Sequence, residues 1–274
     1  MSDGAPGRQA TGHPDAVEIK QCCARLYESD IVRRLLGESF HPGGNALTER
    51  LGVMLGLSPG SLVLDAASGN GTSAVFLAQR FGCRVVGVDL GGENVARATA
   101  EAVRLGLEDR LRFEVGDAEQ LPLNESAVDA VVCECAFCTF PDKPRAAREF
   151  ARVLKPAGRV ALSDITRSPG APGELSDLMS WVACLADARS AAEYAEWLTD
   201  AGFTDAVGEH HDEVLTDMIR GIGTRLLATE VLAGLGKLDL AGIDLAAAKR
   251  LTKEAMEAVA ERRLGYAIIT ATKL

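Results

Sequence analysis

Features missing from this chain of 274 residues exclude several classes of protein. No apolar run approaches the length of about 20 residues that a membrane-spanning helix needs. No stripe of basic residues is present and the net charge is −10, so a nucleic-acid substrate is not expected. The first ten residues have no hydrophobic signal core. We therefore expect a cytoplasmic protein that binds neither membranes nor nucleic acid.

The absence of an export signal also determines how the seven cysteines are interpreted. In a reducing compartment they are expected to be free thiols and not a disulfide framework. The length fits one α/β domain with additions, and an apolar content of 47% is ample for a core.

The most informative stretch is residues 62–71, Leu-Val-Leu-Asp-Ala-Ala-Ser-Gly-Asn-Gly. An apolar strand ends in Asp65, and Gly69 and Gly71 precede a helical run over 72–80. Glycine allows a tight turn and lets a ligand lie against the main chain. The following helix offers free N–H groups and the positive end of its dipole. This pattern predicts a nucleotide-like ligand at the carboxyl end of a parallel sheet.

Further strands and a helix follow in alternation, as in a doubly wound α/β sheet. The second strand ends in Asp89, an acid that suits the two hydroxyls of a ribose. The expected strands cover 83–89, 111–115, 128–133 and 158–164, with a helix over 141–154.

Over roughly residues 45–165 the chain resembles the class I S-adenosylmethionine (SAM) methyltransferases. The matching pieces are Asp65-x-x-x-Gly69-x-Gly71, the ribose-side Asp89, the adenine-side Asp117-Ala118, and Leu154-Lys155-Pro156-x-Gly158. A dehydrogenase is the alternative, since Ala74 is allowed in its glycine motif, but the last two pieces favour methyl transfer.

The resemblance implies a Rossmann-like, seven-stranded sheet with an antiparallel last strand, and SAM as cofactor. Ala67 stands where the family often has a third glycine, and its methyl group is tolerated if its φ is negative. The cofactor-binding residues implied are Asp65, Ala67, Gly69, Gly71, Thr72, Asp89, Leu90, Asp117, Ala118 and Glu134.

The rest of the chain is expected to add helices to this core. Residues 15–36 and 46–57 are predicted helices, separated by Phe-His-Pro-Gly-Gly at 40–44. The apolar faces of a later helical pair are expected to cover the sheet or a partner subunit, in which case the protein is a homodimer. The expected divisions are a disordered tail 1–14, a helical cap 15–60, the SAM-binding core 61–212, a helical insertion 213–264 and the final strand 265–274.

The cysteines are the second informative feature. Cys133, Cys135 and Cys138 lie at the carboxyl end of the fourth predicted strand, where this fold does its chemistry. If strand geometry persists, Cys133 and Cys135 point to one face. Cys22 and Cys23 lie in the first helix, and Cys184 follows a Pro/Gly-rich loop over 167–173, whereas Cys83 is expected only to pack.

Two short stretches are similar to arsenite methyltransferases. Residues 134–143, Glu-Cys-Ala-Phe-Cys-Thr-Phe-Pro-Asp-Lys, are similar to that family's Asn-Cys-x-x-Asn-Leu-x-Pro-Asp-Lys, and residues 184–188 to its Glu-Cys-x-x-Gly-Ala. The departures are Glu134 and Cys138 in place of asparagine, and Ala183 in place of glutamate.

That similarity implies that Cys135 and Cys184 hold a metalloid substrate. Cys138 and an N-terminal cysteine would assist. Cys22 and Cys23 project about 100° apart on a helix, so only one of them is expected to face the site.

Thiolates suit such a substrate because trivalent arsenic is a soft acceptor. Its lone pair attacks the sulfonium methyl in line, so no general base is needed and the protein supplies alignment. The expected acceptor is arsenite, together with glutathione or another thiol.

Three alternatives remain open from the residues alone. The acceptor could be a small organic O, N or C nucleophile with His41, Glu134, His210 or His211 as base. A zinc site could form from the three cysteines at 133, 135 and 138. The chain could also be a SAM- or metalloid-binding sensor without turnover, since active and inactive relatives share binding motifs.

Overall fold

The computed structural model describes residues 16–37, 40–168, 187–234 and 244–274. One mixed sheet of seven strands has the order β3-β2-β1-β4-β5-β7-β6. The first five strands are parallel, and β7 pairs antiparallel with both of its neighbours. The predicted α/β Rossmann-like class with an antiparallel last strand is confirmed. The strands are β1 Leu62–Ala66, β2 Arg84–Asp89, β3 Leu111–Val115, β4 Val128–Glu134, β5 Leu154–Arg167, β6 Phe203–His210 and β7 Leu264–Lys273.

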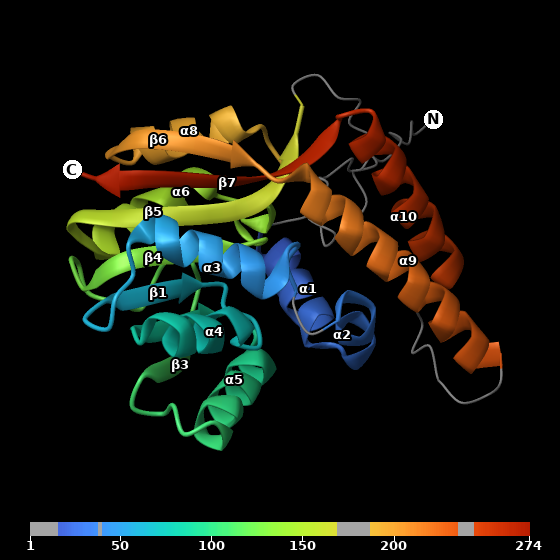
Figure 1. The fold of residues 1–274 in the computed structure, drawn as a ribbon, viewed down its shortest axis with the longest axis horizontal. Helices are drawn as coiled ribbons and strands as arrows, with labels where there is room; N and C mark the ends of the chain where they lie inside the picture. Colours follow the sequence, from blue (N-terminus) through green and yellow to red (C-terminus); the bar gives the residue numbers. More distant parts are fainter. Residues whose placement is uncertain (1–15, 38–39, 169–186, 235–243) are drawn as a thin grey trace, which may run out of the picture.

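Helices cover both faces of the sheet, with α3 in front of it and α6 behind it in Figure 1. α3 packs on α4, and α6 packs on α8. Burial on both faces explains why the central strands β1 and β4 are nearly continuous apolar runs. The helices are α3 Gly44–Leu55, α4 Thr72–Phe81, α5 Gly92–Arg104, the 3-10 turn η1 Phe137–Thr139, α6 Lys143–Val153 and α8 Ala191–Asp200.

The N-terminal segment differs from the single helix predicted over 15–36. The chain bends at Ser29, which separates α1, Ala16–Glu28, from α2, Asp30–Leu36. Both helices lie at the carboxyl ends of the parallel strands, and the end of α2 reaches Arg225 in the middle of α9, Asp212–Gly234 (Figure 1). The break lets α1 cross the edge of the sheet while α2 packs on α9.

A helical pair projects from the same edge of the sheet, where β6 ends and β7 begins. α9, Asp212–Gly234, and α10, Leu245–Ala260, pack against each other, and α9 also contacts β7 (Figure 1). Near the sheet Leu215 and Ile219 of α9 are buried, whereas farther out Leu227 and Val231 are exposed. Within the described ranges no helix combines the length and the apolar character of a membrane span.

The order of the strands determines where a ligand can bind. β1 lies between β2 and β4, so the chain winds away from β1 in opposite directions on its two sides. Open α/β sheets bind ligands in the crevice that this reversal leaves at the carboxyl ends of the strands. Here the residues at that edge include Asp65, Asp89 and Glu134.

Candidate functional site

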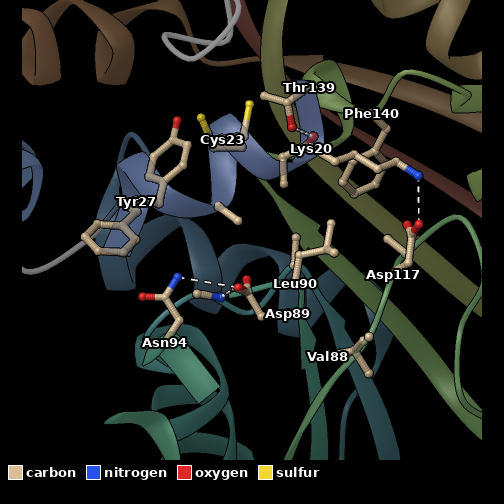
Figure 2. Close-up of a pocket in the computed structure, with 18 of the residues that line it drawn as sticks. Lys20, Cys23, Tyr27, Val88, Asp89, Leu90, Asn94, Asp117, Thr139 and Phe140 are labelled. Carbon is tan, nitrogen blue, oxygen red and sulfur yellow. Dashed lines mark hydrogen bonds and ion pairs between the residues drawn. The ribbon is translucent and has the colours of Figure 1, made fainter. Parts of the chain in front are cut away.

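A pocket opens at the carboxyl ends of the central strands, beneath α1 (Figure 2). Side chains from α1, from the loop after β1 and from the ends of β2 and β4 line it together. The predicted cofactor residues that line it are Ala67, Gly69, Asp89, Leu90, Asp117, Ala118 and Glu134.

The floor of the pocket is the loop between β1 and α4. Gly69 has a φ of 53°, and a Cβ built there would lie 3.3 Å from the ring of Phe40, which lines the pocket from the N-terminal side. The condition set for Ala67, a negative φ, is not met, since its φ is 59°. An alanine held in the left-handed region is strained, and such strain is concentrated at ligand sites.

Gly71 and Thr72 do not line the pocket but build its turn. A Cβ at Gly71, whose φ is 79°, would lie 2.8 Å from both Ala98 and Phe113. The Thr72 hydroxyl donates to the side chain of Asn70 at 2.8 Å. Their contribution to a bound ligand is therefore the shape of the loop.

Asp89 is fixed at the end of β2 by the two loops that meet there. Its carboxylate accepts hydrogen bonds from the backbone N–H groups of Gly69 and Gly91, each at 2.8 Å. Burial raises the pKa of Asp89, the backbone bonds oppose that rise, and the nearby Glu28 charge adds to it. A preorganised carboxylate lining the pocket fits the hydroxyls of a ribose.

Beyond Asp89 the pocket has an apolar wall suited to a flat heterocycle. Val88, Leu90 and Ala118 line it, and Leu90 is 44% exposed although apolar. Asp117 lies at the rim of this wall, with its side chain 32% exposed. The pocket therefore offers both parts of an adenosine site.

We expect Asp89→Ala to weaken the binding of S-adenosylhomocysteine by about 1–3 kcal/mol, because charge-assisted hydrogen bonds are lost. Calorimetric titration measures the change. Asp109→Ala is a matched control, since Asp109 is exposed in the turn before β3. Equal affinities for the two variants would remove Asp89 from the ligand site.

Asp65 lies beneath the pocket and does not line it. Its side chain is buried, and Oδ2 has no hydrogen-bond partner. Burial raises the pKa of Asp65 well above its usual value, and the charges of Glu134 and Asp89 raise it further. A cationic ligand above these three carboxylates would offset their mutual repulsion.

This arrangement predicts that SAM binding is coupled to proton release. Because the pKa of Asp65 is raised, its protonation contributes to the stability of the free protein at low pH. This contribution is lost as the pH rises through the pKa of Asp65. A bound sulfonium lowers that pKa, so SAM affinity should rise with pH between the bound-state and free-state values. Calorimetry in buffers of different ionisation enthalpy measures the protons released. S-adenosylhomocysteine lacks the sulfonium charge and should release fewer; equal release by the two ligands would contradict the coupling.

Glu134 and His41 form a buried polar cluster beside the pocket. The Glu134 carboxylate accepts from Thr48 Oγ1 at 3.0 Å and from Ser73 Oγ at 2.6 Å. His41 Nε2 lies 3.6 Å from Glu134 Oε2 and 3.2 Å from Ser73 Oγ. His41 Nδ1 lies 3.2 Å from the Pro42 carbonyl, which can only accept, so Nδ1 carries the proton in this contact.

Of the four residues considered as bases, only these two meet. His210 is exposed at the end of β6, and His211 Nε2 lies 2.7 Å from Glu209 Oε1. Neither histidine lines the pocket. Of the four, Glu134 lines the pocket and His41 adjoins it through Glu134. A base for an organic acceptor would therefore be Glu134, or His41 acting through Glu134.

The structure brings two of the predicted thiols to one pocket. Cys23 from α1 and Cys135 from the end of β4 both line it, whereas Cys22 is not among the lining residues. Cys184 lies outside the described residues. The question of which N-terminal cysteine faces the pocket is thus answered in favour of Cys23.

The other cysteines near β4 do not join them. Strand geometry does not persist beyond Glu134, because Cys135 has a φ of 53° and turns into the pocket. Cys133 is fully buried, and burial raises its pKa well above the usual value. Cys138 is also buried, at 1% exposed. The condition under which Cys133 and Cys135 would share a face, continued strand geometry, is therefore not met.

A zinc site is not supported by this arrangement. Over the described ranges, no three His, Cys, Asp or Glu side chains form a group able to hold a metal ion. Cys83 packs as predicted, since it is buried, donates to the Leu77 carbonyl at 3.4 Å, and has its pKa raised to about 11 by burial.

Several lining residues were not predicted from the sequence. Lys20 and Tyr27 occur at helical spacing from the predicted Cys23 and lie along the same side of α1 in Figure 2. Only that spacing could have indicated them in advance. Asn94, whose Nδ2 lies 3.4 Å from Asp89, and Thr139 beyond Cys135 carry no sequence motif.

Comparison with known proteins places the chain among methyltransferases. Residues 64–162 match a methyltransferase domain family. The chain is 30% identical over 261 residues to 27-O-demethylrifamycin SV methyltransferase of Amycolatopsis mediterranei, covering 89% of this chain and 93% of that protein.

Two other relatives match only part of their own length. Phosphoethanolamine N-methyltransferase 1 of Arabidopsis thaliana is 30% identical over 208 residues, 75% of this chain and 40% of that protein. Arsenite methyltransferase of Halobacterium salinarum is 32% identical over 150 residues, 54% of this chain and 38% of that protein. The chain thus spans less than half the length of these two relatives.

A solved structure shares the fold. Phosphoethanolamine N-methyltransferase 2 of Haemonchus contortus, in complex with phosphomonomethylethanolamine and S-adenosylhomocysteine, has a TM-score of 0.78 at 19% identity, with 93% of this chain and 60% of that chain covered. At that identity the likeness concerns the architecture alone.

Proposed function

The chain belongs to the SAM-dependent methyltransferases, and from this premise we propose that it transfers the methyl group of SAM to a thiolate-held metalloid, most simply trivalent arsenic. The observation that carries the proposal is that Cys23 and Cys135, far apart in the sequence, line the same pocket as Asp89 and the apolar wall. Similarity to an arsenite methyltransferase over 150 residues supports the same acceptor.

When bound, SAM supplies an electrophilic methyl group. Asp89 would hold the ribose, Val88, Leu90 and Ala118 would contact the adenine, and the carboxylate of Glu134 would face the cationic end. This donor set fits the group, because Asp65 Oδ2 is a buried acceptor without a partner below that end.

Two thiolates would hold the metalloid, with Cys184 or an added thiol such as glutathione as a third ligand. Soft sulfur ligands select arsenic over harder ions and leave its lone pair free. The lone pair forms the new arsenic–carbon bond as the methyl–sulfur bond breaks, and the electrons of that bond remain on the departing sulfur as a thioether. No proton has to be removed, so the contribution of the protein is alignment.

A second candidate is an organic acceptor with an ionisable hydroxyl or amine. The specific observation in its favour is the buried contact between His41 and Glu134 beside the pocket. The rifamycin-pathway relative that this chain matches along nearly its whole length also points to this acceptor class. Such a reaction needs a base, whereas the metalloid reaction does not.

Methyl-labelled SAM distinguishes the two candidates. Reduced protein with arsenite and glutathione should give S-adenosylhomocysteine and methylated arsenic, and without arsenite the label should stay in SAM. Turnover of a phenol or amine in the absence of arsenite would favour the organic acceptor. Binding of SAM without turnover in either assay would indicate a sensor.

A further inference from the structure

Helix α1 is attached to the rim of the pocket at both ends. At its first turns Lys20 Nζ lies 2.7 Å from Asp117 Oδ2 and also contacts Glu119. At its last turn the Glu28 carboxylate accepts from the Glu93 N–H at 3.0 Å, at the start of α5. The helix therefore spans the pocket between two fixed supports.

The Lys20 support is built from rigid parts. Glu119 is 4% exposed, and its other carboxylate oxygen accepts the Asp142 N–H at 2.7 Å. Asp117 is bound through Oδ1 to the Glu119 N–H at 2.9 Å, which closes a local turn. The Lys20 side chain itself is only 19% exposed. These contacts fix the ammonium group between two carboxylates that cannot easily move.

Cys23 lies between the two supports. Lys20, Cys23 and Tyr27 are at positions i, i+3 and i+7, so they share one face of the helix, and all three line the pocket. Tyr27 is in turn packed on Phe40, with ring centroids 6.0 Å apart. The position of the Cys23 sulfur is therefore linked to whether Lys20 stays on Asp117.

We propose that Lys20 is a positioning residue that couples the adenine-side rim of the pocket to the acceptor thiol, by fixing α1 so that Cys23 stands over the same pocket as Cys135. This proposal rests on the proposed function, because it gives Cys23 a role in holding the acceptor. It adds that the ion pair between Lys20 and Asp117, at the adenine side of the rim, determines the position of the Cys23 thiol.

The test is the rate at which a small alkylating reagent modifies Cys23, read by peptide mass spectrometry on the full chain without donor. In Lys20→Met the helix loses one support, so Cys23 should react at least about five-fold faster than in the wild type. Lys20→Arg keeps the charge and should restore a rate near that of the wild type. In turnover, Lys20→Met should raise the KM for arsenite more than it lowers kcat.

Arg25→Met is the matched control. Arg25 lies on the same helix, but its guanidinium donates to the backbone and side chain of Gln21, one turn away. This variant removes the same charge and should leave the Cys23 rate unchanged. Cooperative unfolding of all variants, followed by circular dichroism, confirms that the change is local.

An alkylation rate in Lys20→Met within twofold of the wild type would overturn the positioning role. So would an equal acceleration in Arg25→Met, because the effect would then come from charge alone. Failure of the metalloid proposal can be distinguished from failure of the positioning role, because alkylation is measured without arsenite. Accelerated alkylation in Lys20→Met with no arsenite turnover in the wild type would reject arsenite as the acceptor and keep the role of Lys20 in placing α1.

Discussion

Replacing Cys135 with serine should lower methyl transfer to arsenite at least about 100-fold while S-adenosylhomocysteine binds as before. Serine is close to isosteric, but its oxygen is a hard, protonated donor that does not compete for arsenic. Cys135 stands directly after β4 with a φ of 53°, so either side chain would face the pocket. The variant therefore changes the ligand and not the shape of the site.

Cys22, the neighbour of Cys23 in the sequence, serves as the control for this experiment. Cys23→Ser should reduce arsenite methylation as strongly as Cys135→Ser, because both cysteines line the pocket. Cys22→Ser should not, since Cys22 is not among the lining residues. Rates and donor affinities are measured side by side for the three variants. Full arsenite turnover in both Cys23→Ser and Cys135→Ser would show that these thiols only pack.

The largest effect on stability is expected from Asp187→Ala, which should lower the free energy of unfolding by about 3 kcal/mol or more. The Lys143 side chain is 2% exposed and forms an ion pair with Asp187. Its ammonium group also donates to the Phe140 carbonyl at 3.0 Å. Removal of the carboxylate would leave a buried ammonium group with one neutral acceptor.

Removing the other partner, in Lys143→Met, should lower the free energy of unfolding less than Asp187→Ala does. In Lys143→Met the Asp187 carboxylate keeps Arg189, whose Nη2 lies 2.5 Å from Oδ1. The double variant Lys143→Met with Asp187→Ala removes both charges and should be more stable than Asp187→Ala alone. Urea unfolding measures all three. Equal losses in the two single variants would show that burial of Lys143 is not what makes the pair important.

The fold could be predicted from the sequence because local patterns and the parallel architecture agree. Asp65 and Asp89 lie at the ends of apolar strands and Asp117 follows the next strand. Parallel strands bring their carboxyl ends to one edge, so these acids are expected close together. The break at Ser29 in the N-terminal helical region was not predicted, since apolar periodicity continues across it.

The thiols could be predicted only in part. Cys135 was recognised by its place after β4. The direction of its side chain depends on a positive φ, which the sequence does not indicate because non-glycine residues rarely adopt it. The same applies to Ala67. Contacts between distant segments, such as Lys20 with Asp117 or His41 with Glu134, depend on tertiary packing and carry no local signal.

The measurement that bears most directly on this account is arsenic X-ray absorption of the reduced protein loaded with arsenite and no small thiol. The wild type should show at least two sulfur ligands on arsenic, and the double variant Cys23→Ser with Cys135→Ser should lose them. Arsenic bound by oxygen alone in the wild type, or an unchanged sulfur shell in the variant, would contradict a metalloid site built by these two thiols.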